Sequence, residues 1–350
     1  MKILRSISIL AIFLMVTANA TAQMSLTPPA AQKPASKPQA KPATAAKKPT
    51  AKPEATPVAP TATVTPAPAP DDPNVDLVYG AYQRGFYKTS FDLATKRAQE
   101  NGDPKAMTML GELYANGFGV KRDDAKAAEW YRRAADGGDR EGMFELAMLR
   151  LAGRGGPVNR EEAVKVLASS AKLGNPKAAY NLALLYLDGQ TLPQDLRRSA
   201  ELLRIAADAG SPEAQYALAT FYKEGTGVPK DIEKAVRLLQ TAALADNVDA
   251  EVEYAIALFN GTGTPKNEPA AVALLRKAAR QNNPIAQNRL ARVLASGQGA
   301  PVDRVEALKW HIIAKTAGKG DPALDEAFAN LSPEERARAE AAVRKWLGTK

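Results

Sequence analysis

The chain has 350 residues and a formal net charge of +9, and it contains no cysteine and a single histidine. Disulfide bonds, thiolate metal sites and cysteine nucleophiles are therefore excluded, and paired-histidine metal motifs cannot form. The charge is uneven: residues 1–70 hold eight lysines and arginines against one acidic residue, which leaves +2 for residues 71–350. A near-neutral body behind a basic N-terminal segment is not typical of a nucleic-acid-binding domain.

Residues 1–22 have the composition of a secretory signal peptide. Two basic residues precede an apolar run over 7–16, and small residues follow at Ala18, Ala20 and Ala22. Signal peptidase requires this combination of a charged start, a short apolar run and small residues at −3 and −1. The alternative, a membrane anchor, needs about 20 apolar residues, roughly twice the length of this run. We expect export with cleavage near Ala20 or Ala22, and no stable membrane insertion afterwards.

Residues 23–72 form a segment rich in proline, alanine and lysine that has no aromatic residue. Such a composition cannot bury enough apolar surface to offset the entropy of ordering the chain. The recurring Lys-Pro pairs, beginning with Lys33-Pro34, favour extended and polyproline II conformations. We interpret the segment as a disordered, solvated tether. The alternative is that its lysines contact acidic envelope polymers.

The body of the chain, 73–350, is built on a repeat of 36 residues. Six rows begin at 104, 140, 176, 212, 248 and 284, without insertion or deletion. The third position is alanine or glycine in every row, and the fourteenth is always glycine. Self-similarity at one fixed period indicates tandem structural repeats.

Each row predicts two helices joined by a tight turn. Apolar residues at i, i+3, i+4 and i+7 indicate a first helix with one buried face, and the glycine at position fourteen is suited to end it in a left-handed conformation. A second glycine follows two positions later in five rows, and Asp or Asn then stands where the second helix needs an N-cap. The pattern predicts an all-α fold, a right-handed α-solenoid of antiparallel helix pairs.

The row at 104–139 is similar to the Sel1-like repeat, a relative of the tetratricopeptide repeat. The tetratricopeptide period is 34, so a period of 36 with a Gly-x-Gly turn favours the Sel1-like repeat. The resemblance covers 104–319, after a degenerate opening unit at 75–103, and implies an exported bacterial protein, periplasmic or secreted. The run at 332–335, Ser-Pro-Glu-Glu, is a capping box that predicts a terminal helix among capping elements at 320–350.

The candidate catalytic groups all have simpler interpretations. The Gly-x-Gly turns lack the strand and lysine context of a phosphate-binding loop. His311 has no catalytic partner and is expected to be packed or half-exposed near the C-terminal cap. Adjacent carboxylates such as Glu161 and Glu162 lie in first helical turns, where they complement the helix dipole. No catalytic residue, cofactor or metal ion is therefore expected.

By the family resemblance, the first helices line a concave groove, with the fifth, ninth and twelfth positions pointing into it. These positions are apolar or aromatic in the middle rows and polar in the flanking rows. An apolar centre with a polar rim is typical of protein-binding surfaces. The predicted partner-binding residues are Phe144, Met148, Tyr180, Leu184, Leu187, Tyr216, Ile256 and Phe259. The alternative is that these side chains fill the inner bend of the stack.

The sequence thus predicts a non-catalytic exported scaffold that binds a protein or peptide in the bacterial envelope. Two alternatives remain: a hydrolase that acts on cell-wall polymers with carboxylates alone, and a purely structural spacer. The composition offers plentiful Asp and Glu, which is the only support for the hydrolase. An open groove would favour the scaffold, and convergent carboxylates in a deep pocket would favour the hydrolase.

Overall fold

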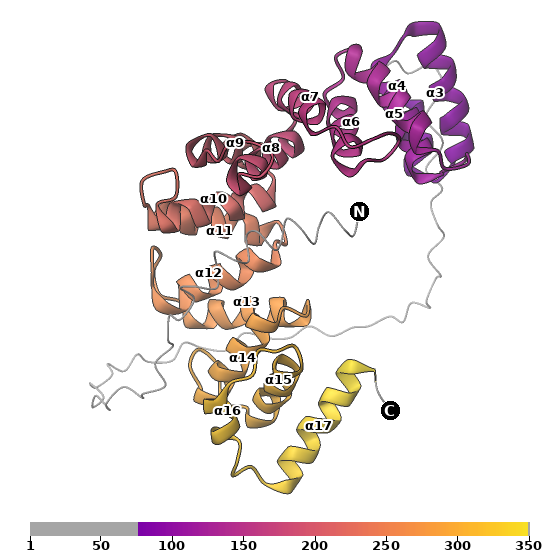
Figure 1. Cartoon of the computed structure of the whole chain (residues 1–350). Coiled ribbons are helices and arrows are strands. Elements are labelled where there is room, and N and C mark those ends of the chain that lie inside the picture. Colours follow the sequence, from indigo (N-terminus) through magenta and orange to yellow (C-terminus); the bar gives the residue numbers. More distant parts are fainter. Residues whose placement is uncertain (1–75, 349–350) are drawn as a thin grey trace, which may run out of the picture. The chain divides into compact units, whose positions relative to one another are not determined.

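The computed structural model describes residues 76–348, so the predicted signal peptide and tether lie outside the described residues. Within that range the chain forms sixteen helices and no strand, which confirms the predicted all-α fold (Figure 1). The helices are α2 (Leu77–Gln83), α3 (Tyr87–Asn101), α4 (Pro104–Asn116), α5 (Asp124–Asp136), α6 (Arg140–Ala152), α7 (Arg160–Lys172), α8 (Pro176–Asp188), α9 (Leu196–Asp208), α10 (Pro212–Glu224), α11 (Ile232–Leu244), α12 (Val248–Asn260), α13 (Glu268–Arg280), α14 (Pro284–Ser296), α15 (Arg304–Thr316), α16 (Pro322–Ala327) and α17 (Pro333–Leu347).

Each 36-residue row forms one pair of 13-residue helices. Row 104–139 gives α4 and α5, and the last row, 284–319, gives α14 and α15. From α3 to α14, each helix packs on the helix before it and the helix after it along the chain. The fold is therefore built from contacts between neighbouring repeats, as in other solenoids.

Polar caps begin the helices of every repeat. The predicted Asp and Asn residues cap the second helices, as when the Asp231 side chain accepts a hydrogen bond from the Lys234 amide. The first helices are capped in the same way by the residue that precedes them, for example by Ser211 and Asn247. Each cap satisfies an amide that the helix leaves without a partner, which stabilises the helix by about 1 kcal/mol.

The core is made of small residues at the helix contacts and leucines between them. Ala178 and Ala183 of α8 and Ala163 of α7 are completely buried, which lets these helices approach closely. Leucines such as Leu182 and Leu203 fill the remaining space. One continuous hydrophobic cluster runs from Phe144 to Ala250, and so the repeats share a core across their boundaries.

The second glycine of each turn lies against the preceding repeat. A Cβ atom at Gly227 would stand 2.2 Å from the carbonyl oxygen of Leu196, the first residue of α9. Gly155 has the same relation to Asp124, the first residue of α5. The sequence predicted only that this glycine continues the turn. In the structure it also lets the turn pack directly on the backbone of the preceding second helix.

The C-terminal end of the described range is closed by α16 and α17. Ser332 and Glu335 form the predicted capping box at the start of α17. Trp310 of α15 and Trp346 of α17 pack edge to face, with ring centroids 5.2 Å apart. His311 is buried, which is one of the two expected states, and its Nε2 atom lies 2.8 Å from a carboxylate oxygen of Asp325.

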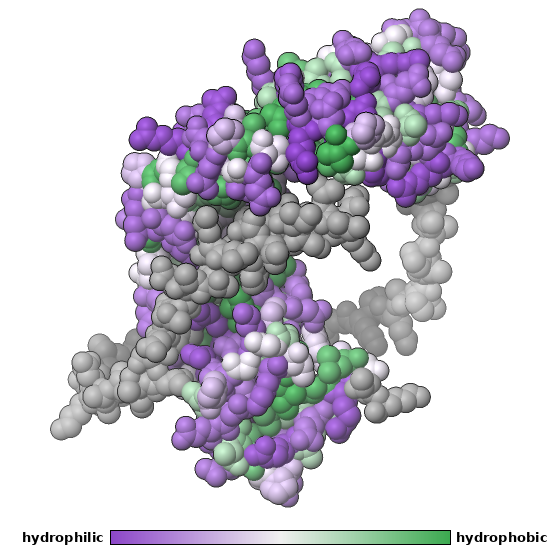
Figure 2. All heavy atoms as spheres, in the orientation of Figure 1, coloured by the Kyte–Doolittle hydropathy of each residue, from purple (hydrophilic) through white to green (hydrophobic). Residues whose placement is uncertain are grey.

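The visible face of the molecule is mainly hydrophilic, and apolar side chains gather beside α17 (Figure 2). Between residues 76 and 348, no helix combines the length and the apolar character that crossing a bilayer demands.

Gly225 and Gly227 allow the two roles of glycine in the turn, a left-handed backbone and close packing, to be tested separately. Both have positive φ angles, +80° and +64°, so replacing either by alanine should cost about 1 kcal/mol in backbone strain. A Cβ at Gly225 meets nothing closer than 3.4 Å, whereas at Gly227 it meets the Leu196 carbonyl. We expect Gly227→Ala to lower the free energy of unfolding by at least about 1 kcal/mol more than Gly225→Ala. Urea unfolding followed by circular dichroism measures both. Equal losses would show that the turn separates freely from α9.

Candidate functional site

The six first helices, α4, α6, α8, α10, α12 and α14, present a common surface. On α8 the third, seventh and eighth positions of the repeat, Ala178, Leu182 and Ala183, are buried, whereas Tyr180 and Leu184 are half-buried. The helical period places the second, fifth, sixth, ninth and twelfth positions on the side away from this buried stripe. We call the surface formed by these five positions the first-helix face.

The predicted partner-binding residues divide into two groups on this face. Phe144 and Phe259 are only 8% and 6% exposed, so they fill space between helices and offer little surface. The Lys177 ammonium lies over the Phe144 ring, 5.6 Å from its centroid, and adds to its cover. The other six are half-buried and keep an accessible part: Met148, Tyr180, Leu184, Leu187, Tyr216 and Ile256.

Tyr180 and Tyr216 lie at the centre of the first-helix face, at the fifth position of adjacent repeats. Both rings pack against the shared hydrophobic cluster. Burial, with a contribution from Glu213, raises the pKa of Tyr180 to about 12, and burial also raises the pKa of Tyr216. Both hydroxyls therefore stay protonated at neutral pH and can donate a hydrogen bond to a bound group.

Carboxylates gather on the first-helix face at α4 and α6. Glu112 of α4 accepts hydrogen bonds from the Tyr131 hydroxyl at 3.1 Å, the Tyr82 hydroxyl at 3.3 Å and the Asn116 amide at 2.8 Å. Glu145 of α6 differs, because its carboxylate forms no hydrogen bond or ion pair with the described residues. Burial and the neighbouring carboxylates of Glu112 and Glu141 raise the pKa of Glu145 to about 7.

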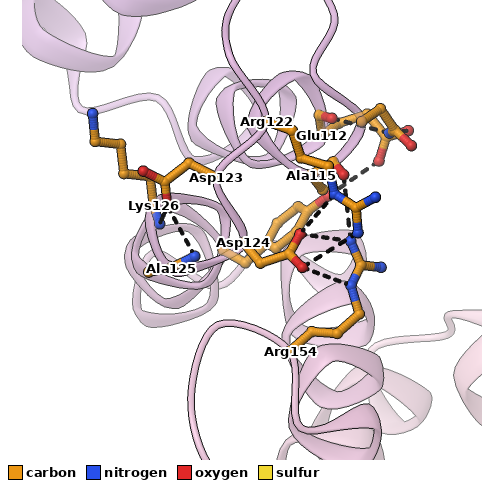
Figure 3. A network of polar contacts seen from close by, with 10 residues as sticks. Glu112, Ala115, Arg122, Asp123, Asp124, Ala125, Lys126 and Arg154 are labelled. Carbon is orange, nitrogen blue, oxygen red and sulfur yellow. Dashed lines mark hydrogen bonds and ion pairs between the residues drawn. The ribbon is translucent and has the colours of Figure 1, made fainter.

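An arginine clamp ties the same two repeats together beside these carboxylates. Arg154, in the turn after α6, binds both oxygens of Asp124 at 3.0 and 2.7 Å and donates to the Ala115 carbonyl at 3.3 Å (Figure 3). This hydrogen-bonded pair lowers the pKa of Asp124. The clamp joins the turn of one repeat to both helices of the repeat before it.

Arginines occupy the other end of the first-helix face, on α14. Arg292 forms an ion pair with Asp321, the N-cap of α16. Arg289 is largely buried, which lowers its pKa, and its Nε atom is buried without a hydrogen-bond partner in the described chain. The sequence analysis missed Glu145 and Arg289, which share the sixth position of the repeat, because it examined only the fifth, ninth and twelfth.

The carboxylate hydrolase would need acidic side chains in a pocket, and a cleft of about 730 Å³ lies between α15 and α17. Its acidic residues all have structural partners: Asp303 caps α15, Glu335 belongs to the capping box, and Glu306 binds Arg276 and the Trp310 indole. Nothing in the cleft points to a hydrolase. Across residues 76–348, no cluster of His, Asp and Glu has the arrangement to hold a metal ion.

Comparison with known families and structures agrees with this architecture. The Sel1 repeat family model matches six consecutive segments, 104–139, 140–175, 176–211, 212–247, 248–283 and 284–319. A Sel1 repeat protein from Oxalobacter formigenes is similar in structure, with a TM-score of 0.60 and 26% identity over 69% of this chain and 98% of its own. A protective antigen of uropathogenic Escherichia coli with an SLR fold has a TM-score of 0.54 and 26% identity, over 75% of this chain and 64% of the antigen. No curated protein sequence matches the chain.

Glu145 should make stability depend on pH. Its pKa is about 7 in the folded chain, against an ordinary value of 4.5, so between these values the folded state binds more protons than the unfolded state. The folded chain therefore loses stability as the pH rises through this window. Glu112, Glu141 and Tyr131 face Glu145, and Lys177 and Arg154 oppose their effect.

We expect Glu145→Gln to have the same free energy of unfolding as the unchanged chain at pH 5 and a free energy of unfolding about 1–2 kcal/mol higher at pH 8. Chemical unfolding at both pH values measures the difference. Glu100→Gln, at an exposed position of α3, controls for removal of one negative charge. An equal gain in the free energy of unfolding at both pH values would contradict the raised pKa of Glu145.

Proposed function

This chain belongs to the Sel1 repeat family, whose members are generally protein-interaction scaffolds, and on that premise we propose that it is a non-catalytic scaffold. Its first-helix face binds a segment of a partner protein. The observation that carries this proposal is the row of six half-buried apolar side chains, Met148, Tyr180, Leu184, Leu187, Tyr216 and Ile256, on successive first helices.

The energetics of this row support binding rather than packing alone. Four of these side chains already rest on the hydrophobic cluster with one edge: Met148, Tyr180, Leu187 and Tyr216. Little conformational entropy is therefore lost when a partner covers the other edge. Covering an accessible apolar surface contributes about 25 cal/mol per Å². Tyrosine is also enriched in binding hot spots, where its ring is buried and its hydroxyl finds a partner.

We also propose that the scaffold acts outside the cytoplasm, as a periplasmic or secreted protein of the bacterial envelope. The composition of residues 1–22 supports export. The segment at 23–72 would then act as a spacer between the cleaved end and the repeats. Its reach, at about 3.1 Å per residue, would be on the order of 100 Å or more.

Export gives a direct test on the full chain expressed in a bacterial host. The mature protein should begin at Thr21 or Gln23, as mass spectrometry of the N-terminal peptide will show. Ala20→Phe places a bulky residue at −1 or −3 of both candidate sites and should leave the precursor uncleaved. A mature chain that keeps its first 22 residues would contradict export by this route.

The double variant Tyr180→Ala with Tyr216→Ala tests the binding face. We expect partner proteins captured from an extract of the source cells to be lost, with stability reduced by about 1–2 kcal/mol per site because the rings are half-buried. Quantitative mass spectrometry of the captured proteins and thermal unfolding measure the two effects.

The matched control is Val164→Ala with Leu238→Ala. These half-buried side chains pack on the same hydrophobic cluster from the second helices α7 and α11. The control should lose stability on the same scale and keep its partners. If both double variants capture the same proteins, the binding surface lies elsewhere.

A further inference from the structure

The cleft between α15 and α17 is lined by six charged side chains: Asp303, Arg304, Glu306, Lys309, Glu335 and Arg338. Three are carboxylates and three are cations, so the lining is formally neutral. The two signs differ in how they are bound. The carboxylates have partners in the protein, whereas the cations remain available to bind a further group.

Each carboxylate of the cleft accepts hydrogen bonds from the protein. Asp303 accepts one from the Glu306 amide at 2.9 Å, and Glu335 accepts one from the N-cap amide of α17 at 3.1 Å. Glu306 is held by the Arg276 guanidinium at 3.1 Å. All three also lie at the N-terminal end of α15 or α17, where the helix dipole offsets a negative charge. The cleft therefore has no free carboxylate with which to bind a cation.

The cations of the cleft have no such partners. Among the described residues, Arg304, Lys309 and Arg338 form no ion pair, and their side chains donate no hydrogen bond. Two carboxylates act on these cations through space, Glu306 on Lys309 and Glu334 on Arg338. Neither carboxylate forms an ion pair with the cation on which it acts. The donors of the cleft can therefore bind an anion without breaking a contact.

Lys309 is the cation that would gain most from a bound anion. Its ammonium lies over the rings of Trp310 and Trp346, 4.1 and 4.8 Å from their centroids, and the side chain is half-buried. Burial lowers the pKa of Lys309, although the Glu306 carboxylate acts in the opposite direction. The rings hold the ammonium in place but supply no counter-charge. A charge that is partly removed from water without a counter-charge is unfavourable, and an anion bound beside it removes that cost.

The cleft also has an apolar part. Val302, Val305 and Ala342 line it together with the cations, and Val302 is 56% exposed. Apolar side chains gather beside α17 on the visible face of the molecule (Figure 2). The volume of about 730 Å³ lies in the range of small-ligand sites, roughly 300–1,000 Å³. A ligand of this cleft can thus bury an apolar group next to its charge.

We propose that the cleft between α15 and α17 binds a carboxylate that is carried on an apolar group. Lys309, Arg304 and Arg338 supply the donors, and a guanidinium can bind both oxygens of one carboxylate. The valines cover the apolar group. The site belongs to the last second helix and the C-terminal cap, so it is separate from the first-helix face and does not depend on the scaffold function.

This chemistry has two sources, a free organic acid and the terminal carboxylate of a polypeptide. Isothermal titration calorimetry on the full chain compares phenylbutyrate with its neutral analogue phenylbutanamide. It also compares an acetylated tripeptide that ends in phenylalanine with the same tripeptide amidated at its C-terminus. At least one carboxylate should bind, and its amide should bind at least about tenfold more weakly. The tighter of the two carboxylates identifies the source.

Three variants locate the binding in the cleft. Lys309→Met keeps an apolar stem over the tryptophan rings and removes the charge, so it should weaken carboxylate binding at least about tenfold, whereas Lys309→Arg should retain it. Arg338→Gln, at an exposed position of α17, should also weaken binding and leaves the lysine in place. The matched control is Lys345→Met, which removes an exposed charge of α17 outside the cleft lining and should change nothing. Urea unfolding checks that every variant is folded.

Three results would overturn the proposal: no binding of either carboxylate at concentrations up to about 1 mM, equal binding of a carboxylate and its amide, or equal effects of Lys309→Met and Lys345→Met. Partner capture by the first-helix face is measured separately with the tyrosine variants. Failure of the carboxylate site would therefore leave the scaffold proposal standing, and the reverse also holds.

Discussion

The stack depends on a backbone-to-backbone contact between each Gly-x-Gly turn and the start of the preceding second helix. At Gly155 and Gly227 this contact leaves no room for a Cβ atom, so at these turns the distance between consecutive repeats is set by main chain and not by side-chain choice. The surfaces of the helices can then vary while the spacing between repeats is kept. The residues of the first-helix face can therefore differ from repeat to repeat while the stack keeps its geometry.

Much of this fold could be predicted from the sequence, because its determinants are local. The period, the helix ends at Gly225 and its equivalents, and the caps such as Asp231 follow from residues a few positions apart. The burial of Phe144 and Phe259 could not, since it depends on how neighbouring first helices close over a side chain, as Lys177 does over Phe144. The surroundings of Glu145 and Arg289 were also out of reach, because they depend on which charges meet between repeats.

Several ion pairs between adjacent repeats join residues at a constant separation in the sequence, which the period alone does not predict. Arg132 binds Glu162, Lys223 binds Glu253 and Arg276 binds Glu306, each pair thirty residues apart. A residue in the second half of one helix thus faces a residue six positions earlier in the equivalent helix of the next row. Exposed pairs of this kind add little stability individually. They connect repeats that are adjacent in the stack, so the charge pattern of one row depends on that of the next.

The position of the tryptophans has a consequence for how this protein can be observed in solution. Trp130 lies in the first full repeat, while Trp310 and Trp346 pack together at the C-terminal cap, with the Lys309 ammonium 4.1 and 4.8 Å from their ring centroids. The four repeats between them, 140–283, contain no tryptophan. Intrinsic indole fluorescence therefore reports the two ends of the array and gives no signal from the centre. In a fold whose cooperativity passes only between neighbours, the fluorescence melting curve describes the two ends, whereas the helix content describes all repeats together.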